Sequence, residues 1–286
     1  MGSDNVHPFH RTGSARLSRG LDLRGAVVVV TGASSGFGEL ASLRFTRAGS
    51  SVVLVARRLE RLEALADRIS ARGGDALAVR CDVTRLGDLE ALRDRVVEAF
   101  GRCDVLVNNA GIPGGGPFEQ VDLAQLQRVV EVNLLGVVRA TKLFLPMMLE
   151  GGRGHVVNIA SLAGRFATPG AAVYGATKHG VVAFSEALYH ELGPKGILVT
   201  SVNPGLSPTE AFRGGPSMVN LDPDRVARLI VDVVRRGRAP EVSIPRAISA
   251  LQAFRVLTPP LYHWGVDRIT RPSSPTRPTH RDPPST

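Results

Sequence analysis

The chain has 286 residues, of which 43% are hydrophobic, so it can bury a sizeable core, and α/β chains of this length often form one domain. Its formal net charge is +9, but more than half of the excess lies in residues 1–24 (+2) and 268–286 (+3), and the rest is scattered arginine. This distribution lacks a basic face with interleaved aromatic residues, so it excludes a nucleic-acid partner, and two cysteines exclude a disulfide framework.

The two ends of the chain differ from its middle in composition. Residues 1–20 and 272–286 are rich in Ser, Pro, Thr, Arg and His, and we expect both to be disordered tails. The N-terminal tail also lacks the continuous apolar stretch of a signal peptide. Between the tails we expect one folded domain over residues 21–245, with residues 246–271 as a C-terminal extension on the same domain.

In chain order, short β-branched runs alternate with segments that carry apolar residues at helical spacing. The strands are expected at residues 26–31, 51–56, 76–81, 104–109, 154–160, 197–203 and 241–244. The helices are expected at residues 38–48, 59–72, 86–100, 122–149, 172–193 and 222–236. This alternation indicates a parallel sheet with helices on both faces, so we predict an α/β fold with about seven strands in a doubly wound sheet.

Two features of this layout bear on the environment of the protein. In a sheet of order 3-2-1-4-5-6, the strands beside Cys81 and Cys103 are not neighbours, so we expect two free thiols in a reducing cytoplasm. The most apolar long stretch, residues 129–149, contains charged residues and Pro146. We therefore interpret it as a core or subunit-interface helix and not as a membrane span.

A glycine-rich turn, residues 31–38, joins the first strand to the first helix. Strand, glycine turn and helix start are the context of a dinucleotide site, because glycine lets the backbone approach a pyrophosphate and the helix N-terminus offers unpaired N–H groups. The same loop taken alone would also fit a tight βα turn. We predict a Rossmann-like fold with a cofactor loop whose residues are Gly32, Ser34, Ser35, Gly36, Phe37 and Gly38.

Two arginines, Arg57 and Arg58, follow the second strand, and no carboxylate lies between Glu39 and Glu60. NAD enzymes usually have an acidic residue here for the ribose 2′-OH, whereas arginine accommodates the 2′-phosphate of NADP. We therefore predict NADP(H) rather than NAD(H). The alternative is that both arginines are solvated residues at a helix start.

Tyr174 and Lys178 are four residues apart on a predicted helix and so share one of its faces. An ammonium group in this position is expected to lower the pKa of the phenol, which prepares it to exchange a proton with an alcohol or carbonyl oxygen. Ser161 follows the fifth strand, at the sheet edge where active sites of open α/β sheets gather. The alternatives are a coincidence on an amphipathic helix and an ordinary turn serine.

Over residues 25–245 the ordered set of motifs resembles the short-chain dehydrogenase/reductase (SDR) family. Besides the residues above, the matching segments are Cys81-Asp82-Val83, Asn108-Asn109-Ala110-Gly111, Asn133, and Pro204-Gly205 with Thr209. The resemblance implies an NADP(H)-dependent oxidoreductase that interconverts a secondary alcohol and a ketone or aldehyde by hydride transfer. The alternative is a regulatory protein that binds NADP(H) without turnover, but all four catalytic positions are filled.

The resemblance also implies a role for each site residue. Tyr174 is the general acid/base, Ser161 binds the substrate oxygen, and Lys178 acts on the tyrosine and the nicotinamide ribose. Asn133 holds a water on the proton relay, although a satisfied core amide fits it equally well. The implied cofactor contacts outside the glycine turn and the two arginines are Asp82, Val83, Asn108, Ala110, Gly111, Tyr174, Lys178, Pro204, Gly205 and Thr209.

The chain departs from the family pattern at Ser207, where a β-branched apolar residue is usual, and in its C-terminal extension. We expect the loop after Thr209 to form a lid over the substrate. The extension resembles members that act on lipophilic alcohols and ketones. It could close an apolar pocket, touch a membrane surface, pack against a subunit or cover a sheet edge.

The remaining expectations concern partners. By resemblance, the long helices at residues 122–149 and 172–193 form the interface of a homodimer or homotetramer. His155, His179 and His190 lack a second ligand cluster, so we predict no metal site and interpret all three as packing or surface residues.

Overall fold

The computed structural model describes residues 20–167, 169–205, 207, 210, 221–245, 252 and 255–261. Contacts divide the chain into two units, Met1–Pro245 and Arg246–Thr286. In the second unit, residues 252, 255–257 and 259–261 are helical. Residues 1–19 of the N-terminal tail, the whole C-terminal tail, most of the C-terminal extension, Thr209 and residues 211–220 of the expected lid lie outside the described residues.

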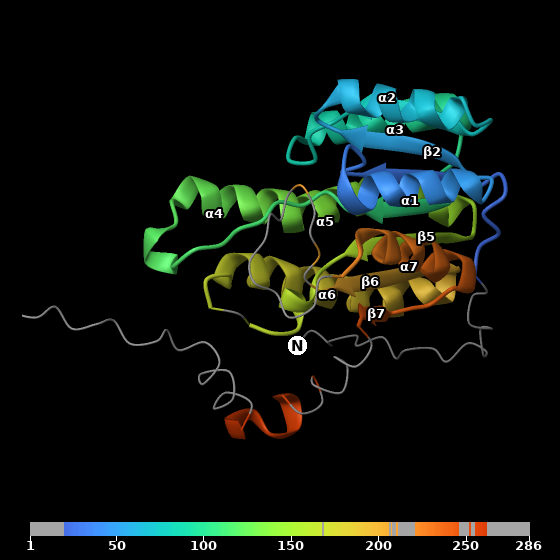
Figure 1. The fold of residues 1–286 in the computed structure, drawn as a ribbon. Helices are drawn as coiled ribbons and strands as arrows, with labels where there is room; N and C mark the ends of the chain where they lie inside the picture. Colours follow the sequence, from blue (N-terminus) through green and yellow to red (C-terminus); the bar gives the residue numbers. More distant parts are fainter. Residues whose placement is uncertain are drawn as a thin grey trace, which may run out of the picture. The chain divides into compact units, whose positions relative to one another are not determined.

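Seven parallel strands form one sheet in the order β3-β2-β1-β4-β5-β6-β7 (Figure 1). The strands are β1 (Val27–Thr31), β2 (Ser51–Ala56), β3 (Asp75–Arg80), β4 (Val105–Asn108), β5 (Gly154–Ile159), β6 (Ile197–Pro204) and β7 (Glu241–Ile244). All residues of β1, β4, β5 and β6 are buried, as expected for central strands with helices on both faces. The predicted fold class and strand order are confirmed.

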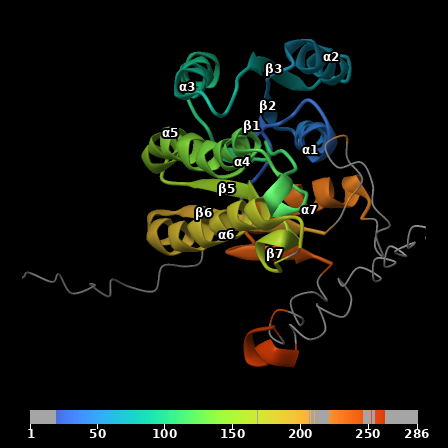
Figure 2. The same ribbon diagram turned by 90° about the vertical axis from the view of Figure 1, so that its left-hand side faces the viewer.

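Helices cover both faces of this sheet (Figure 2). One face carries α1 (Gly36–Arg47), α2 (Leu59–Ser70) and α7 (Pro223–Arg236), and the other carries α3 (Leu86–Phe100), α5 (Gly136–Glu150) and α6 (Ala172–Leu192). Alternate residues of β1 serve the two layers, because Val28 and Val30 pack toward α1 and α7 while Val27 and Val29 pack toward α3 and α5.

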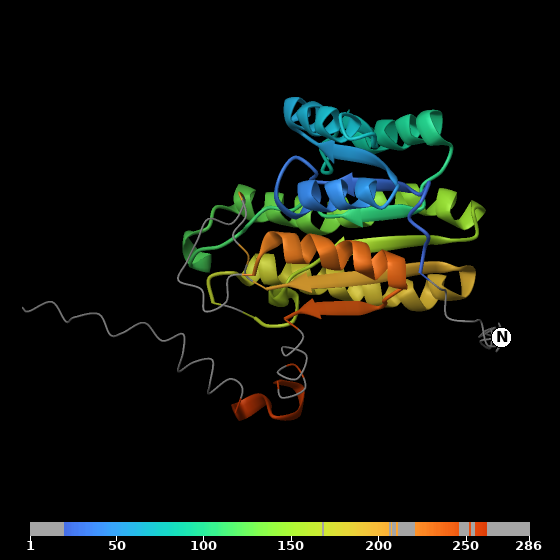
Figure 3. The ribbon, with the colours of Figure 1, turned by 45° about the vertical axis from the view of Figure 1, so that its right-hand side comes forward.

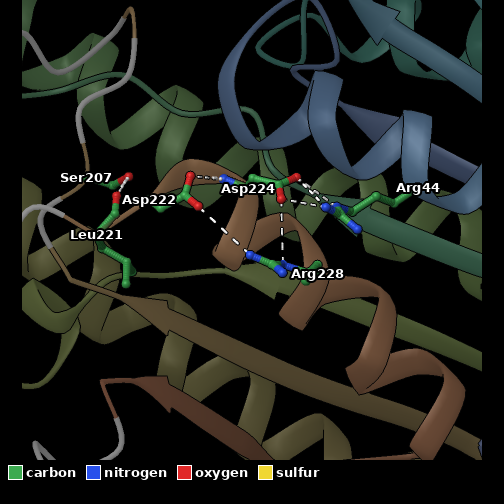
Figure 4. A network of polar contacts seen from close by, with 6 residues as sticks. All are labelled: Arg44, Ser207, Leu221, Asp222, Asp224 and Arg228. Atoms are coloured by element: carbon green, nitrogen blue, oxygen red, sulfur yellow. Dashed lines mark hydrogen bonds and ion pairs between the residues drawn. The ribbon is translucent and has the colours of Figure 1, made fainter.

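The start of α7 shows how local sequence sets a helix end. Asp222 is the N-cap, its side chain accepts a hydrogen bond from the Asp224 N–H (2.9 Å), and proline follows at the first helical position. The Asp224 carboxylate in turn accepts a hydrogen bond from Arg44 of α1 (Nε–Oδ1 2.9 Å; Figure 4). This contact joins α1 to α7, which lie side by side (Figure 3).

The predicted helix over residues 122–149 contains a π-turn. The structure has α4 (Leu123–Val130), a π-helical turn η2 (Glu131–Leu135) and then α5. The segment is therefore helical throughout, as predicted, and the π-turn lies where the Asn133 side chain hydrogen-bonds to the backbone of Ile112. Such π-turns are frequent at functional sites.

By length and hydropathy alone, Leu123–Glu150 could cross a membrane, with a mean hydropathy of 1.4. Its Phe144 and Met148, however, are fully buried against the sheet. This burial is what a core helix requires, so the segment is weak evidence for a membrane span.

Cys81 and Cys103 are free, as predicted, and both are buried. Burial raises the pKa of the Cys81 thiol to about 12 and raises that of Cys103 further above its usual range. Both groups therefore stay protonated at neutral pH and have little nucleophilic character.

Candidate active site

The glycine turn has the backbone shape that a pyrophosphate requires. Gly32 and Gly36 have positive φ angles of +68° and +58°, which residues with a Cβ rarely adopt. A Cβ on Gly38 would lie 2.4 Å from the Gly32 carbonyl oxygen, so a larger residue would force the turn apart. The first turn of α1 opens directly onto this loop. The loop therefore fits a dinucleotide phosphate, although Phe37 packs its side chain against the core and can contribute only through its backbone.

Thr31 and Asn109 fix this turn through hydrogen bonds. The Asn109 side chain donates to the carbonyl oxygens of Thr31 (2.9 Å) and Gly32 (3.2 Å), while the Thr31 hydroxyl accepts from the N–H groups of Asn109 and Ala110 (3.0 Å each). These bonds join the carboxyl ends of β1 and β4. Sequence reasoning included Asn109 in a motif but gave it no role, and the signal that could have found it is its place directly after a strand.

Asn108, one residue earlier, faces the interior. Its amide donates to Thr141 (3.0 Å) and Asn158 (2.8 Å), and Asn158 donates to Ser185 of α6 (2.9 Å). All four side chains are buried. The Asn108 side chain therefore supports the sheet and α6, whereas the family resemblance implied a contact with the cofactor.

The predicted cofactor-selecting arginines occupy different positions. The Arg58 guanidinium donates to the hydroxyls of Ser34 (3.0 Å) and Ser35 (3.3 Å) and so lies over the glycine turn. Arg57 is exposed. The Arg58 guanidinium also meets Glu210, which follows β6 in the chain and which sequence reasoning did not single out.

After β3, the predicted pair Asp82 and Val83 forms a compact turn. Asp82 accepts hydrogen bonds from the N–H (3.0 Å) and hydroxyl (2.8 Å) of Thr84. Val83 is buried and contacts Gly136, where an added Cβ would lie 3.0 Å from a Val83 methyl group. Asp82 therefore orders its own turn at the carboxyl end of the sheet.

Ser161, Tyr174 and Lys178 come together at the carboxyl end of β5. Ser161 caps the short 3₁₀ turn η3 (Leu162–Gly164), accepts from the Ala163 N–H (3.2 Å) and hydrogen-bonds to Tyr174. Lys178 is 5% exposed, donates to the Ile159 carbonyl (2.8 Å) and lies 5.8 Å from the centroid of the Tyr174 ring. The predicted convergence of these three side chains is present.

The direction of the tyrosine pKa shift differs from the expectation. Burial raises the pKa of Tyr174 above its ordinary value, and the hydrogen bond with Ser161 opposes that rise only in part. Burial also lowers the pKa of Lys178 to about 8. The expected depression of the tyrosine pKa by its lysine was therefore wrong for the protein alone, because removal of the phenol from water dominates.

Asn133 lies beside this group within the π-turn. Its side chain accepts from the Ile112 N–H (2.8 Å) and donates to the Ile112 carbonyl (2.9 Å), and it is fully buried. A Cβ added to Gly111 would lie 3.4 Å from Asn133 Oδ1 and 3.7 Å from Lys178 Nζ, so Gly111 separates the two side chains. The Asn133 side chain is therefore a buried amide with both of its hydrogen bonds made to Ile112, which is the alternative given in the sequence analysis.

Pro204 and Gly205 complete the site. Pro204 ends β6, and the Gly205 N–H donates to the Ile244 carbonyl (2.9 Å). A Cβ on Gly205 would lie 3.3 Å from Leu162, which follows Ser161. The strand ends of β1, β5 and β6 therefore contribute the glycine turn, the serine and this proline–glycine turn to the same edge of the sheet.

Ser207, the departure from the family pattern, has a structural role. It is buried, and its hydroxyl donates to the Leu221 carbonyl (2.5 Å), next to the Asp222 cap of α7 (Figure 4). Within the described part of the chain, no group of three His, Cys, Asp or Glu side chains could hold a metal ion.

The family model described as short chain dehydrogenase matches residues 26–218. The chain belongs to the short-chain dehydrogenase/reductase family. It is an oxidoreductase of the kind that acts on CH–OH groups with NAD(P).

Several relatives resemble the chain over most of its length. The ketoacyl reductase HetN of Nostoc sp. is 38% identical over 256 residues, which cover 87% of this chain and 89% of that protein. The structure of a single-residue variant of the actinorhodin polyketide ketoreductase with NADPH matches with a TM-score of 0.72 and 34% identity, over 77% of this chain and 95% of that one. An SDR from Burkholderia phymatum in complex with NAD matches with a TM-score of 0.75 and 28% identity, over 90% of this chain and 99% of that one. Relatives with NADPH and with NAD therefore both share the fold.

Proposed function

We propose that this enzyme reduces a ketone or aldehyde to the alcohol with NADPH, with Tyr174 as the proton donor. The supporting observation is the phenol of Tyr174, which hydrogen-bonds to Ser161 and lies close to buried Lys178 at the edge of the sheet that holds the glycine turn. Because the pKa of Tyr174 is raised, the phenol carries its proton at neutral pH, which is the form that reduction requires.

Each residue has one task in this proposal. When bound, the nicotinamide supplies the hydride. Ser161 donates a hydrogen bond to the substrate oxygen and stabilises the negative charge that develops on it. Tyr174 gives its proton to that oxygen, and the Lys178 ammonium stabilises the phenolate that remains. Because the Asn133 side chain is already paired with Ile112, any hold on a relay water comes from the backbone of the π-turn.

The preference for NADP(H) rests on Arg58. Its guanidinium reaches the glycine turn through Ser34 and Ser35, which is the position where a 2′-phosphate would be held. A guanidinium pairs with phosphate through two parallel charge-assisted hydrogen bonds. Exposed Arg57 adds positive charge nearby.

The substrate is proposed to be lipophilic. A small depression is lined by the apolar side chains of Val121, Leu126, Val129 and Val173, and Val173 precedes Tyr174 in the chain. Ketoacyl and polyketide reductases among the relatives, by their names, act on ketones of acyl chains. We further propose a homodimer or homotetramer in a reducing cytoplasm, where the buried cysteines remain thiols.

The test compares wild type with Tyr174→Phe in NADPH consumption against a panel of ketones and aldehydes. Loss of the phenol hydroxyl should lower kcat/KM by about 10²–10⁴-fold, the usual worth of a general acid, while calorimetry should still show nucleotide binding. Turnover by the phenylalanine variant at the wild-type rate would refute the role of Tyr174. Nucleotide binding without turnover of any carbonyl by wild type would favour the regulatory alternative.

A further inference from the structure

A carboxylate bridges two arginines at the mouth of the predicted phosphate site. Glu210 accepts from Arg58 (Nη1–Oε1 2.9 Å) and from Arg61 (Nη1–Oε2 2.7 Å). The same Arg58 guanidinium donates through Nη2 to the Ser34 hydroxyl (3.0 Å). The Arg58 guanidinium therefore connects three parts of the chain: the glycine turn, the start of α2 and the segment after β6.

Most exposed ion pairs of this kind contribute little to stability, so their energy does not indicate a function. The location of these ion pairs beside the glycine turn does indicate one. Arg58, Arg61 and the hydroxyls of Ser34 and Ser35 offer more donors than one carboxylate can use, and phosphate offers three acceptor oxygens. Carboxylate and phosphate oxygens bind guanidinium groups in the same geometry, so Glu210 lies where a phosphate would bind.

Glu210 is also charged. Hydrogen bonds from Arg58 and then Arg61 lower the pKa of the Glu210 carboxyl to about 2. The group is therefore an anion throughout the physiological pH range.

We propose that Glu210 occupies the 2′-phosphate position in the free enzyme, and that Arg61 is a second cation of the 2′-phosphate site. Binding of NADP(H) then exchanges the carboxylate for the phosphate on Arg58 and Arg61. NAD(H) lacks the 2′-phosphate and has no group with which to displace Glu210. This inference rests on the NADP(H) preference proposed above.

Calorimetric titration of the full-length protein with adenosine 2′,5′-bisphosphate tests the exchange without turnover. Glu210→Gln keeps the shape of the side chain but removes the competing charge, so it should tighten this probe by about 2–5-fold, the usual range for one exposed ion pair. Arg61→Gln should weaken the probe by about 10-fold or more, as expected for a hydrogen bond to a charged group. Adenosine 5′-monophosphate, which lacks the 2′-phosphate, should bind all variants alike.

Glu63→Gln is the matched control, because Glu63 is an exposed carboxylate of α2 and its loss changes the net charge by the same amount. If Glu210→Gln and Glu63→Gln alter affinity for the bisphosphate equally, or if Arg61→Gln has no effect, the exchange is refuted. Weakening by Arg58→Gln in that case would leave the NADP(H) preference intact. Equal affinity of wild type for the two adenosine probes would instead refute the preference itself.

Discussion

His155 makes the stability of this fold sensitive to acid. It lies fully buried in β5, its Nε2 is 2.8 Å from the Thr200 hydroxyl, and that hydroxyl donates its proton to the Arg238 carbonyl (2.6 Å). His155 Nε2 must therefore be the donor to Thr200. Its Nδ1 has no hydrogen-bond partner among the described residues. The imidazole ring is therefore neutral, and His155 is a packing residue of the core.

Burial lowers the pKa of His155 from 6.5 to about 3. The unfolded chain therefore takes up a proton that the folded chain cannot, and the stabilising contribution is complete above the unfolded pKa and is lost as the pH falls toward 3. The loss approaches about 1.4 kcal/mol per pH unit in this window. Between about pH 7.5 and pH 5, His155 alone should cost the native state roughly 2 kcal/mol.

The assay is urea unfolding followed by circular dichroism at several pH values, for wild type and His155→Gln. Glutamine can still donate a hydrogen bond to Thr200 but cannot titrate. Between about pH 7.5 and pH 5, the free energy of unfolding of the variant should therefore fall by roughly 2 kcal/mol less than that of wild type. His190→Gln, at an exposed position, should keep the wild-type slope. Equal slopes for wild type and His155→Gln would refute the reasoning, whatever the absolute stability of the variant.

Three further predictions concern the site. Reduction should decline as the pH rises through about 8, because Lys178 then loses the charge that stabilises the phenolate. A pH profile of kcat/KM checks this, and a rate that keeps rising past that point would contradict it. Gly38→Ala places a methyl group 2.4 Å from the Gly32 carbonyl and should weaken nucleotide binding by about 10-fold or more, with a loss of about 1–3 kcal/mol of stability. Asn109→Leu should weaken nucleotide binding through the loosened turn, whereas Asn108→Leu should mainly lower the free energy of unfolding; calorimetry and urea unfolding separate the two, and the reverse pattern would contradict the assignment.

Most of the sheet was predictable because its central strands are short β-branched runs, which are buried by a layer of helices on each face. Val28 and Val29 illustrate this, since neighbouring valines enter opposite cores. The start of α7 was predictable from Asp222 and Pro223, whose side chains act within their own turn. Local signals of this kind can be read from the sequence directly.

The remaining features depend on contacts between distant residues. The π-turn at Asn133 lies where its side chain bonds to Ile112, 21 residues earlier, and a contact of that kind cannot be read from helical periodicity. The sequence places Lys178 one turn from Tyr174, but the pKa of the phenol depends on burial that the whole fold creates. Arg61 and Glu210 are 149 residues apart, and nothing in their local sequences pairs them.

The amide and hydroxyl chain from Asn108 through Asn158 to Ser185 connects the interior of the sheet with α6, which carries the tyrosine and the lysine. None of these three groups ionises in the pH range in which proteins are studied, and salt does not screen neutral hydrogen bonds inside a core. This link between the sheet and α6 is therefore insensitive to acidity and ionic strength, whereas the link from Lys178 to the Ile159 carbonyl contains a group that titrates near pH 8. Changes of rate near that pH accordingly point to Lys178 and not to the chain of neutral hydrogen bonds.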